Sequence, residues 1–248
     1  MVSIITPTYG RVDRLPLLWE AIQSQIWPRL EWLVEDDSPQ PSQFMQSIAD
    51  SRVHYVHDPT RRSIGEKRNR LIARAEGEYI AHFDDDDYYA PQYLQQMVLA
   101  LETGHADLCK LSGFFLFYSV SGDLAYWNLL EKTGIHFKWA GNSLQPILVT
   151  EQNNAELLQM HMGFGFSYVY RRSVWSTIQF PDQDLHEDLH FILATEKTKH
   201  VLLLPDTSGL CLHILHGGNS SRCFPQYVLP PFMAESIFPA ATPYLKRV

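Results

Sequence analysis

Four short apolar runs alternate with amphipathic stretches in the first 105 residues, and this alternation constrains the fold more than any other feature of the chain. The runs are VSII, RLEWLV, RVHYVHD and EYIAHF, and each is followed by polar residues that are typical of turns. Strands that alternate with helices form parallel sheets with right-handed crossovers. The sequence therefore predicts an α/β fold with a mostly parallel sheet flanked by helices.

The stretches between these runs carry signals that start and stop helices. Ser63 and Glu66 have the spacing of a capping box, in which each side chain satisfies a backbone N–H of the first helical turn. Gly77 and Gly104 stand where a helix would end. We expect helices within residues 13–25, 63–77 and 90–104.

Polar side chains follow three of the predicted strands at the point where each strand ends. In open α/β sheets, ligands bind beyond the carboxyl ends of the parallel strands, so these side chains are expected to line one cleft. The residues concerned are Thr6, Thr8 and Tyr9, then Asp36 and Asp37, and finally the acid run at 84–87. This edge of the sheet is strongly acidic.

The acid run places four aspartates in a row behind an apolar strand. If the strand continues into the run, Asp84 and Asp86 share one face and Asp85 and Asp87 share the other. Two carboxylates aimed at one point repel each other, and a bound divalent cation relieves this repulsion; oxygen ligands with open positions suit Mg²⁺ or Mn²⁺. A solvated acidic turn that caps the next helix explains the run equally well. An EF-hand is excluded, because its sixth position would be Tyr89 rather than glycine.

Composition narrows the classes of partner. The chain has 248 residues, 45% of them apolar, and a formal net charge of −8 without a long basic run. These features argue against nucleic acids and anionic membrane surfaces as main partners. Cys109, Cys211 and Cys223 are odd in number and widely spaced, which favours free thiols in a reducing compartment. No apolar run is long enough for an integral membrane segment, so we expect a cytoplasmic protein; a homo-oligomer remains an open alternative.

The second half of the chain has a different texture. Residues 106–221 are rich in aromatics with mixed strand and loop character, and we expect them to complete the cleft. The segment 222–248 is rich in proline, and we expect it to lie against the core or a neighbouring subunit. Five aromatics are candidates for stacking on sugar rings, although core packing is the more common role: Trp127, Phe137, Trp139, Phe164 and Phe166.

Several motifs in order resemble those of glycosyltransferase family 2. The matching stretches are VSIITPTYGR, LEWLVEDDSP, GEKRNRLIARAEGEYIAHFDDDD, GFGFSYVYRRSVW, DLHEDLHF and LHILHGGNSS. The resemblance implies a GT-A type, Rossmann-like fold and inverting transfer of a sugar from a nucleotide diphosphate donor. It also implies one domain over 1–248, with a nucleotide-sugar-binding half at 1–105, an acceptor-binding and catalytic-base half at 106–221, and the tail.

The resemblance also implies roles for the residues at the sheet edge. Asp84 and Asp86, with His216, would hold Mn²⁺ or Mg²⁺, and His216 fits that place better than His213. Lys67 and Leu71 depart from the small residues that are frequent in the family, which leaves the donor contacts of that helix open. The implied donor-binding residues are Thr6, Thr8, Tyr9, Asp36, Asp37, Arg68, Asp84 and Asp85. A zinc site built from Cys211, His213, His216 and Cys223 is a weaker alternative, because paired-cysteine spacing is absent.

Inverting transfer needs a base that takes the proton of the acceptor hydroxyl. The resemblance assigns this role to Asp188, with Glu187 as its neighbour in acceptor binding, and leaves Asp182 and Asp184 as weaker candidates. No Q-x-x-R-W motif follows Asp188, which favours non-processive transfer of a single hexose.

The donor expected from the resemblance is a UDP-sugar. The acceptor is expected to be a saccharide, a lipid-linked sugar or a small molecule. Two alternatives belong to other classes: a magnesium-dependent phosphoryl-transfer hydrolase that uses the run Asp84–Asp87, and a sugar- or nucleotide-binding module without catalysis.

Overall fold

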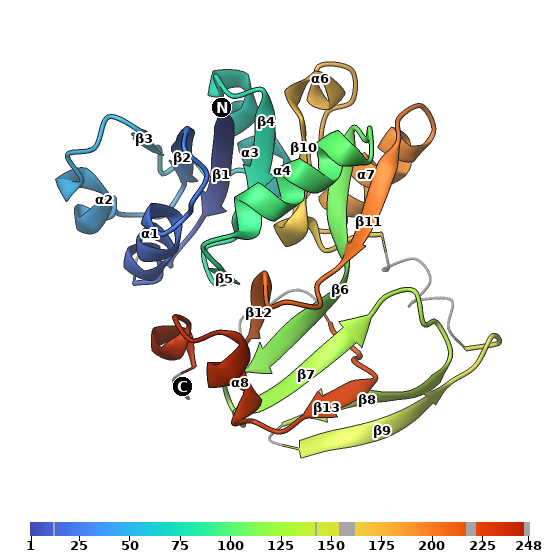
Figure 1. Ribbon diagram of the computed structural model, residues 1–248. Helices are drawn as coiled ribbons and strands as arrows, with labels where there is room; N and C mark the ends of the chain where they lie inside the picture. The colour runs from blue at the N-terminus through green and yellow to red at the C-terminus, as the bar shows by residue number, and fades with distance from the viewer. Residues whose placement is uncertain (12, 142, 154–161, 217–221, 246–248) are drawn as a thin grey trace.

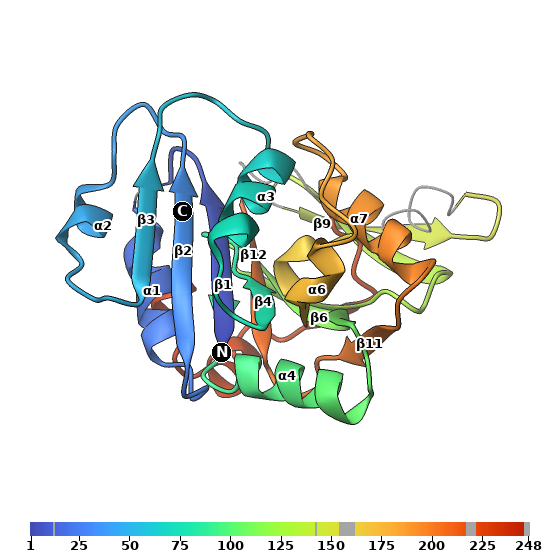
Figure 2. The ribbon, with the colours of Figure 1, turned by 90° about the horizontal axis from the view of Figure 1, so that it is seen from above.

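The computed structural model describes residues 1–248 except 12, 142, 154–161, 217–221 and 246–248. Strands and helices alternate in its first half as the sequence predicts. These elements are β1 (Val2–Thr8), α1 (Leu15–Gln23), β2 (Leu30–Asp36), α2 (Gln43–Ser47), β3 (Val53–His57), α3 (Ile64–Arg74) and β4 (Tyr79–His82). Strand β1 pairs in parallel with both β2 and β4, and β2 pairs in parallel with β3. Figure 2 shows the four strands side by side. The predicted parallel sheet is confirmed.

The helix signals work as expected at the start of α3 and differ at its end. The Ser63 hydroxyl accepts a hydrogen bond of 3.1 Å from the Glu66 N–H, so the capping box forms on this side. The helix ends at Arg74, three residues before Gly77. Gly77 instead lies against β1, where a Cβ would come within 2.5 Å of the Ser3 hydroxyl. This glycine therefore permits close approach of two backbone segments.

The second half extends the sheet and adds antiparallel pairing. The sheet order is β13-β7-β6-β10-β4-β1-β2-β3, and β10 pairs antiparallel with both β4 and β6. Strands β11 and β12 pair in parallel with successive parts of β6, and β12 also pairs with β5. The bounds are β5 (Tyr88–Tyr89), α4 (Tyr93–Thr103), β6 (Leu108–Tyr118), β7 (Asp123–Asn128), η1 (Gly165–Ser167), β10 (Val169–Arg171), α6 (Arg172–Trp175), α7 (Glu187–Glu196), β11 (Val201–Pro205), β12 (Cys211–Leu215) and β13 (Tyr227–Leu229).

Successive side chains of β1 point to opposite faces of the sheet and belong to two separate hydrophobic clusters. Ile4 packs in one cluster with Leu18 of α1 and Leu94 of α4. Ile5 packs in another with Leu71 of α3 and, among others, residues of α7. Helices therefore cover both faces of the parallel sheet, as expected when its strands are buried on both sides.

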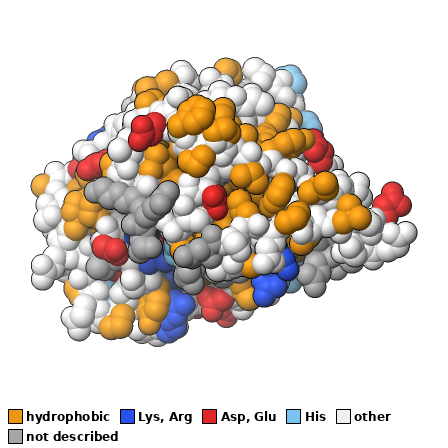
Figure 3. Space-filling model, turned by 90° about the horizontal axis from the view of Figure 1, so that it is seen from below, with side chains coloured by type: hydrophobic (Ala, Val, Ile, Leu, Met, Phe, Trp, Pro, Cys, Tyr) orange, Lys and Arg blue, Asp and Glu red, His pale blue; other side chains and the backbone are white. Residues whose placement is uncertain are grey.

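The lower part of the molecule in Figure 1 holds β7, β13, the hairpin of β8 (Gly134–Ala140) and β9 (Ser143–Val149), and α8 (Met233–Ile237). The proline-rich tail packs against the core up to η2 (Thr242–Tyr244), where the Tyr244 hydroxyl donates to the Leu17 carbonyl. Figure 3 looks onto this part of the molecule, where many hydrophobic side chains reach the surface. In the described part of the chain, no helix has the length and apolar character needed to cross a bilayer.

Candidate active site

The acid run forms a turn rather than a continuation of strand β4. The strand ends at His82, and the Asp87 N–H lies 3.5 Å from the Asp84 carbonyl oxygen. The expected alternation, with Asp84 and Asp86 on one face, therefore does not apply. The turn instead directs the four carboxylates toward different partners.

Asp85 and Asp86 share one cation. Nη1 of Arg11 lies 2.8 Å from an Asp85 oxygen and 2.5 Å from an Asp86 oxygen. The Thr8 hydroxyl also donates to Asp85, and Nε2 of His216 lies 2.9 Å from Asp86. Burial, reinforced by the charge of Asp86, raises the pKa of Asp85 to about 6. Burial also opposes ionisation of Asp86, but the hydrogen bond from His216 and the charge of Arg11 outweigh it and lower the pKa of Asp86.

Asp84 and Asp87 differ in burial: the Asp84 side chain is partly exposed to solvent, and that of Asp87 is not. The Asp87 side chain is fully buried, and it accepts hydrogen bonds from the His213 ring and from the Ile214 N–H. The Asp84 side chain is 32% exposed, and its nearest ionic partner is Nη2 of Arg68 at 3.7 Å. Desolvation raises the pKa of Asp84 to about 6 against the opposing charge of Arg68.

The residues predicted to hold a metal are only partly brought together. Asp86 and His216 are in contact and supply one oxygen and one nitrogen donor. Asp84 points toward Arg68 instead. Within the described ranges, no group of three carboxylate, imidazole or thiol side chains converges as a metal site, and this applies equally to the zinc alternative. The stretch Gly217–Ser221 lies outside the described residues.

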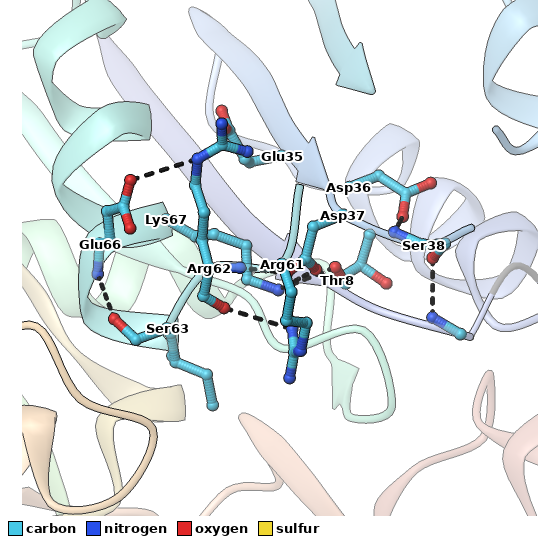
Figure 4. A network of polar contacts seen from close by, with 12 residues as sticks. Thr8, Glu35, Asp36, Asp37, Ser38, Arg61, Arg62, Ser63, Glu66 and Lys67 are labelled. Carbon is cyan, nitrogen blue, oxygen red and sulfur yellow. Dashed lines mark hydrogen bonds and ion pairs between the residues drawn. The ribbon is translucent and has the colours of Figure 1, made fainter. Parts of the chain in front are cut away.

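A second polar network lies at the ends of β1 and β2 (Figure 4). The Asp37 carboxylate accepts hydrogen bonds from Nζ of Lys67 at 2.6 Å, from Nη1 of Arg61 at 2.6 Å and from the Arg62 N–H at 2.9 Å. Burial opposes ionisation of Asp37, but these hydrogen bonds outweigh it and lower its pKa. Lys67, which departs from the family pattern, is therefore a buried partner of the acid edge, and its ammonium also donates to the Thr8 carbonyl.

The other residues predicted for nucleoside binding differ in accessibility. Thr6 is fully buried, and its hydroxyl donates to the Phe83 carbonyl, so it joins β1 to the segment after β4. Asp36 is 1% exposed, and its carboxylate accepts hydrogen bonds from the Ser38 N–H and the Tyr55 hydroxyl. Tyr9 is 45% exposed, with the Arg61 guanidinium 4.1 Å from its ring centroid. Tyr9 is thus the member of this set that offers a surface for stacking.

The Glu187–Asp188 pair occupies the first turn of α7, where the helix dipole favours carboxylates. One oxygen of Asp188 accepts the Gly165 N–H at 2.7 Å, and the other accepts the Leu189 N–H at 2.7 Å. A Cβ on Gly165 would lie 2.8 Å from that of Asp188, so glycine at 165 lets the two segments meet. Burial raises the pKa of Glu187 to about 7, with Arg68 opposing and Asp188 adding to the shift.

Arg68 joins the acid turn to helix α7. Its Nη2 atom lies 3.7 Å from Asp84 and 3.5 Å from Glu187, and the residue is 4% exposed. These side chains and Asp188 line a cavity of about 560 Å³. The cavity is therefore lined by the carboxylates of α7, by a buried cation and by one end of the acid turn.

Some of the remaining candidate residues line the cavity, and the others lie in the core, on the β8–β9 hairpin or at the start of α3. Phe164 and Phe166 line the cavity and also belong to the core, whereas Trp127 lies only in the core. Phe137 and Trp139 lie on the β8–β9 hairpin. Asp182 accepts the Ser63 hydroxyl, and Asp184 accepts the Ile64 N–H, so both support the start of α3, and Asp184 also reaches the cavity.

Sequence reasoning missed three polar residues of this region: Arg11, His82 and Lys110. Lys110 is fully buried on β6 and donates to the Gly163 carbonyl at 2.6 Å, and burial lowers its pKa to about 7. His82 lies in the strand before the acid turn and contacts Arg68. The signal that would have identified Lys110 and His82 is a lone ionisable residue near the middle of an apolar stretch.

Comparisons with known proteins show the family and the fold of the chain. A model of the family described as glycosyl transferase family 2 matches residues 3–178. The UDP-Glc:alpha-D-GlcNAc-diphosphoundecaprenol beta-1,3-glucosyltransferase WfaP of Escherichia coli is 29% identical over 105 residues, which are 42% of this chain and 42% of that protein. This chain thus matches less than half of that relative's length.

Two solved structures show the same fold. Staphylococcus aureus TarS 1–349 in complex with UDP-GlcNAc has a TM-score of 0.60 and 18% identity, over 88% of this chain and 59% of that one. The mannosyltransferase PcManGT of Pyrobaculum calidifontis, in complex with GDP-Man and Mn²⁺, has a TM-score of 0.61 and 16% identity, over 88% of this chain and 58% of that one. The expected GT-A fold class is confirmed by these similarities together with the family match.

Proposed function

Because the chain belongs to glycosyl transferase family 2, we propose that it transfers a single hexose from a nucleotide diphosphate donor to an acceptor hydroxyl, with inversion at the sugar carbon. The observation that carries this proposal is the bridge formed by Arg68. This residue connects Asp84, at the end of the donor-side strand, with Glu187, next to Asp188 on α7. Donor groups and an acceptor base can therefore meet in one cavity.

The donor would lie along the carboxyl edge of the parallel sheet. Tyr9 offers an exposed ring that contacts Arg61, which is itself hydrogen-bonded to Asp37. A hydrogen bond from Thr8 to Asp85 joins the end of β1 to the acid turn. Asp36 sits beside this path with both oxygens engaged, so contact with a base or ribose would exchange one of its present hydrogen bonds. We propose a UDP-sugar; TarS is described with UDP-GlcNAc and PcManGT with GDP-Man, so the screen below includes both bases.

Asp188 would act as the general base. It would accept the proton of an acceptor hydroxyl while that oxygen forms a bond to C1 of the sugar and the C1–O bond to the diphosphate breaks. The Gly165 N–H and the start of α7 hold the carboxylate in place. Glu187, whose pKa is about 7, can exchange hydrogen bonds with a second acceptor hydroxyl. A saccharide, a lipid-linked sugar or a small molecule would each supply such hydroxyls.

Asp86 and His216 would hold Mn²⁺ or Mg²⁺ together with the donor diphosphate, with Asp84 next in the same turn. A bound cation would offset the charge that develops on the leaving nucleoside diphosphate. The contact between a carboxylate and an imidazole, and the acidic surroundings that Arg11 now partly neutralises, fit a divalent ion.

A thermal-shift screen of UDP-glucose, UDP-GlcNAc and GDP-mannose, each with and without Mn²⁺, tests the proposal. A donor at 100 times its Kd stabilises the folded chain by about 2.7 kcal/mol, which corresponds to a rise in Tm of roughly 5–10 °C for a chain of this size. We expect one donor to exceed the others and to need the metal. Equal curves with every nucleotide sugar would contradict the proposal.

The hydrolase alternative is not favoured, because the family model and the similar structure of the mannosyltransferase PcManGT concern sugar transfer. It would also leave Asp188 and its glycine support without a role. Release of phosphate from simple monoesters would be its signature. A binding module without catalysis would bind a donor and yet form no product with any acceptor.

A further inference from the structure

His82 lies at the point where the acid turn, α3 and the Gly165 segment meet. It is the last residue of β4, two positions before Asp84, and it is 1% exposed. Its ring packs against those of Tyr168, Tyr170 and Phe180, with centroids 5.5–5.6 Å away. The ring is thus fixed on several sides.

The hydrogen-bond partners of His82 define its protonation. Nδ1 contacts Nη1 of Arg68 and lies 3.0 Å from the Gly165 carbonyl oxygen, and Nε2 lies 3.1 Å from the Tyr170 hydroxyl. Because a guanidinium can only donate, Nδ1 accepts this bond with its lone pair, and its 3.0 Å approach to the Gly165 carbonyl oxygen is then a contact rather than a hydrogen bond. The proton then resides on Nε2. Burial and the charge of Arg68 both lower the pKa of His82, so the ring is neutral and carries a single proton.

Apart from His82, the Arg68 guanidinium has a ring contact with Phe180, whose centroid lies 5.7 Å from Cζ, and two ionic contacts. Its Nε atom is buried and has no hydrogen-bond partner among the described residues. Its contacts with Asp84 and Glu187, at 3.7 and 3.5 Å, are ionic and longer than hydrogen bonds. The contact with His82 is therefore the close, directional one that fixes the guanidinium plane.

We propose that His82 is a positioning residue that holds the Arg68 guanidinium between Asp84 and Glu187, and so aligns the donor side of the cavity with the acceptor side. This inference rests on the proposed function. His82 touches no reacting group itself, and its effect passes through Arg68 and the adjoining Gly165 segment.

Three variants test the proposal. His82→Leu removes the acceptor for Arg68, whereas His82→Asn places an amide oxygen near the position of Nδ1. Tyr170→Phe is the matched control, because it removes the hydrogen bond on the Nε2 side and leaves the contact with Arg68. We expect kcat to fall at least about tenfold in His82→Leu, because small misplacements in an active site are costly. His82→Asn should recover most of that loss, and Tyr170→Phe should stay within about threefold of the original rate.

A spectroscopic measurement makes the test independent of turnover. In nitrogen NMR spectra of arginine-labelled protein, a guanidinium held in one orientation gives separate Nη1 and Nη2 signals, and a rotating one gives an averaged signal; Arg68→Lys identifies the signals. We expect separate signals in the original chain and in His82→Asn, and averaging in His82→Leu. Separate signals that persist in His82→Leu would overturn the inference, whether or not transfer is observed. Failure of the proposed function would instead appear as absence of transfer in the unaltered chain.

Discussion

Replacing Gly165 by alanine places a methyl group directly against the proposed base. The new Cβ would lie 2.8 Å from the Cβ of Asp188, 3.0 Å from Nη1 of Arg68 and 3.2 Å from an Asp188 oxygen. Ordinary contacts of this kind begin at 3.4 Å, so Asp188 must retreat by about 0.6 Å or more. The same movement stretches its 2.7 Å hydrogen bond from the Gly165 N–H.

The expected result is a loss of catalysis with donor binding retained. A misplacement of about 1 Å in an active site can cost roughly 100-fold, so we expect kcat to fall about 10- to 100-fold. The tight contact should also lower the free energy of unfolding by about 1–3 kcal/mol. Initial rates at saturating donor give kcat, and titration calorimetry with the nucleotide gives the donor Kd, which should change less than kcat because the closest conflict is with Asp188 rather than Arg68.

Gly104→Ala is the matched control for this experiment. Its Cβ would lie 2.9 Å from the Ala100 carbonyl oxygen and 3.1 Å from Leu202, a similar conflict at the end of α4. We expect a comparable loss of stability with kcat nearly unchanged. If Gly165→Ala keeps its kcat, or if both variants lose it equally, the claim that Gly165 positions Asp188 is refuted.

Two further predictions concern the charges of the site. Arg11→Ala removes the cation between Asp85 and Asp86, so the chain without nucleotide should bind Mn²⁺ several-fold more tightly in calorimetric titrations; weaker binding would contradict this role. Glu187→Gln should change the pH dependence of stability, because burial raises the pKa of Glu187 in the folded chain to about 7 against 4.5 for the ordinary group. The stability that its protonated form contributes is fully present below pH 4.5 and is lost as pH rises through 7. Urea unfolding should therefore show the original chain losing up to about 3 kcal/mol relative to Glu187→Gln between pH 4.5 and 8, and parallel pH curves would speak against the shift.

The fold of the first half could be predicted because its signals are local. Each apolar run is bounded by its own turn residues, and the Ser63–Glu66 cap lies within one helical turn. The placement of β10 between β4 and β6 was beyond such reasoning. That strand spans only Val169–Arg171, and its pairing depends on contacts with residues about 60 to 90 positions away.

Some features of the candidate site could also be predicted from the sequence, and others depend on the folded chain. The sequence predicted Asp188 and Arg68 as site residues, and both line one cavity in the structure. The direction of each carboxylate in the acid run was not predictable, because it depends on where β4 stops and the turn begins. Arg11 was missed since an arginine in a turn is common, and its position between two carboxylates arises only from the folded chain.

The central claim is that Asp188 takes the proton of the acceptor while the sheet edge binds the donor. Asp188→Asn keeps the size of the side chain and removes its basicity. With the donor identified by the thermal-shift screen, we predict that this variant binds the nucleotide sugar with a Kd within about threefold of the original and forms glycosylated product at least about 1,000-fold more slowly. Product formation by Asp188→Asn at the original rate would contradict the account.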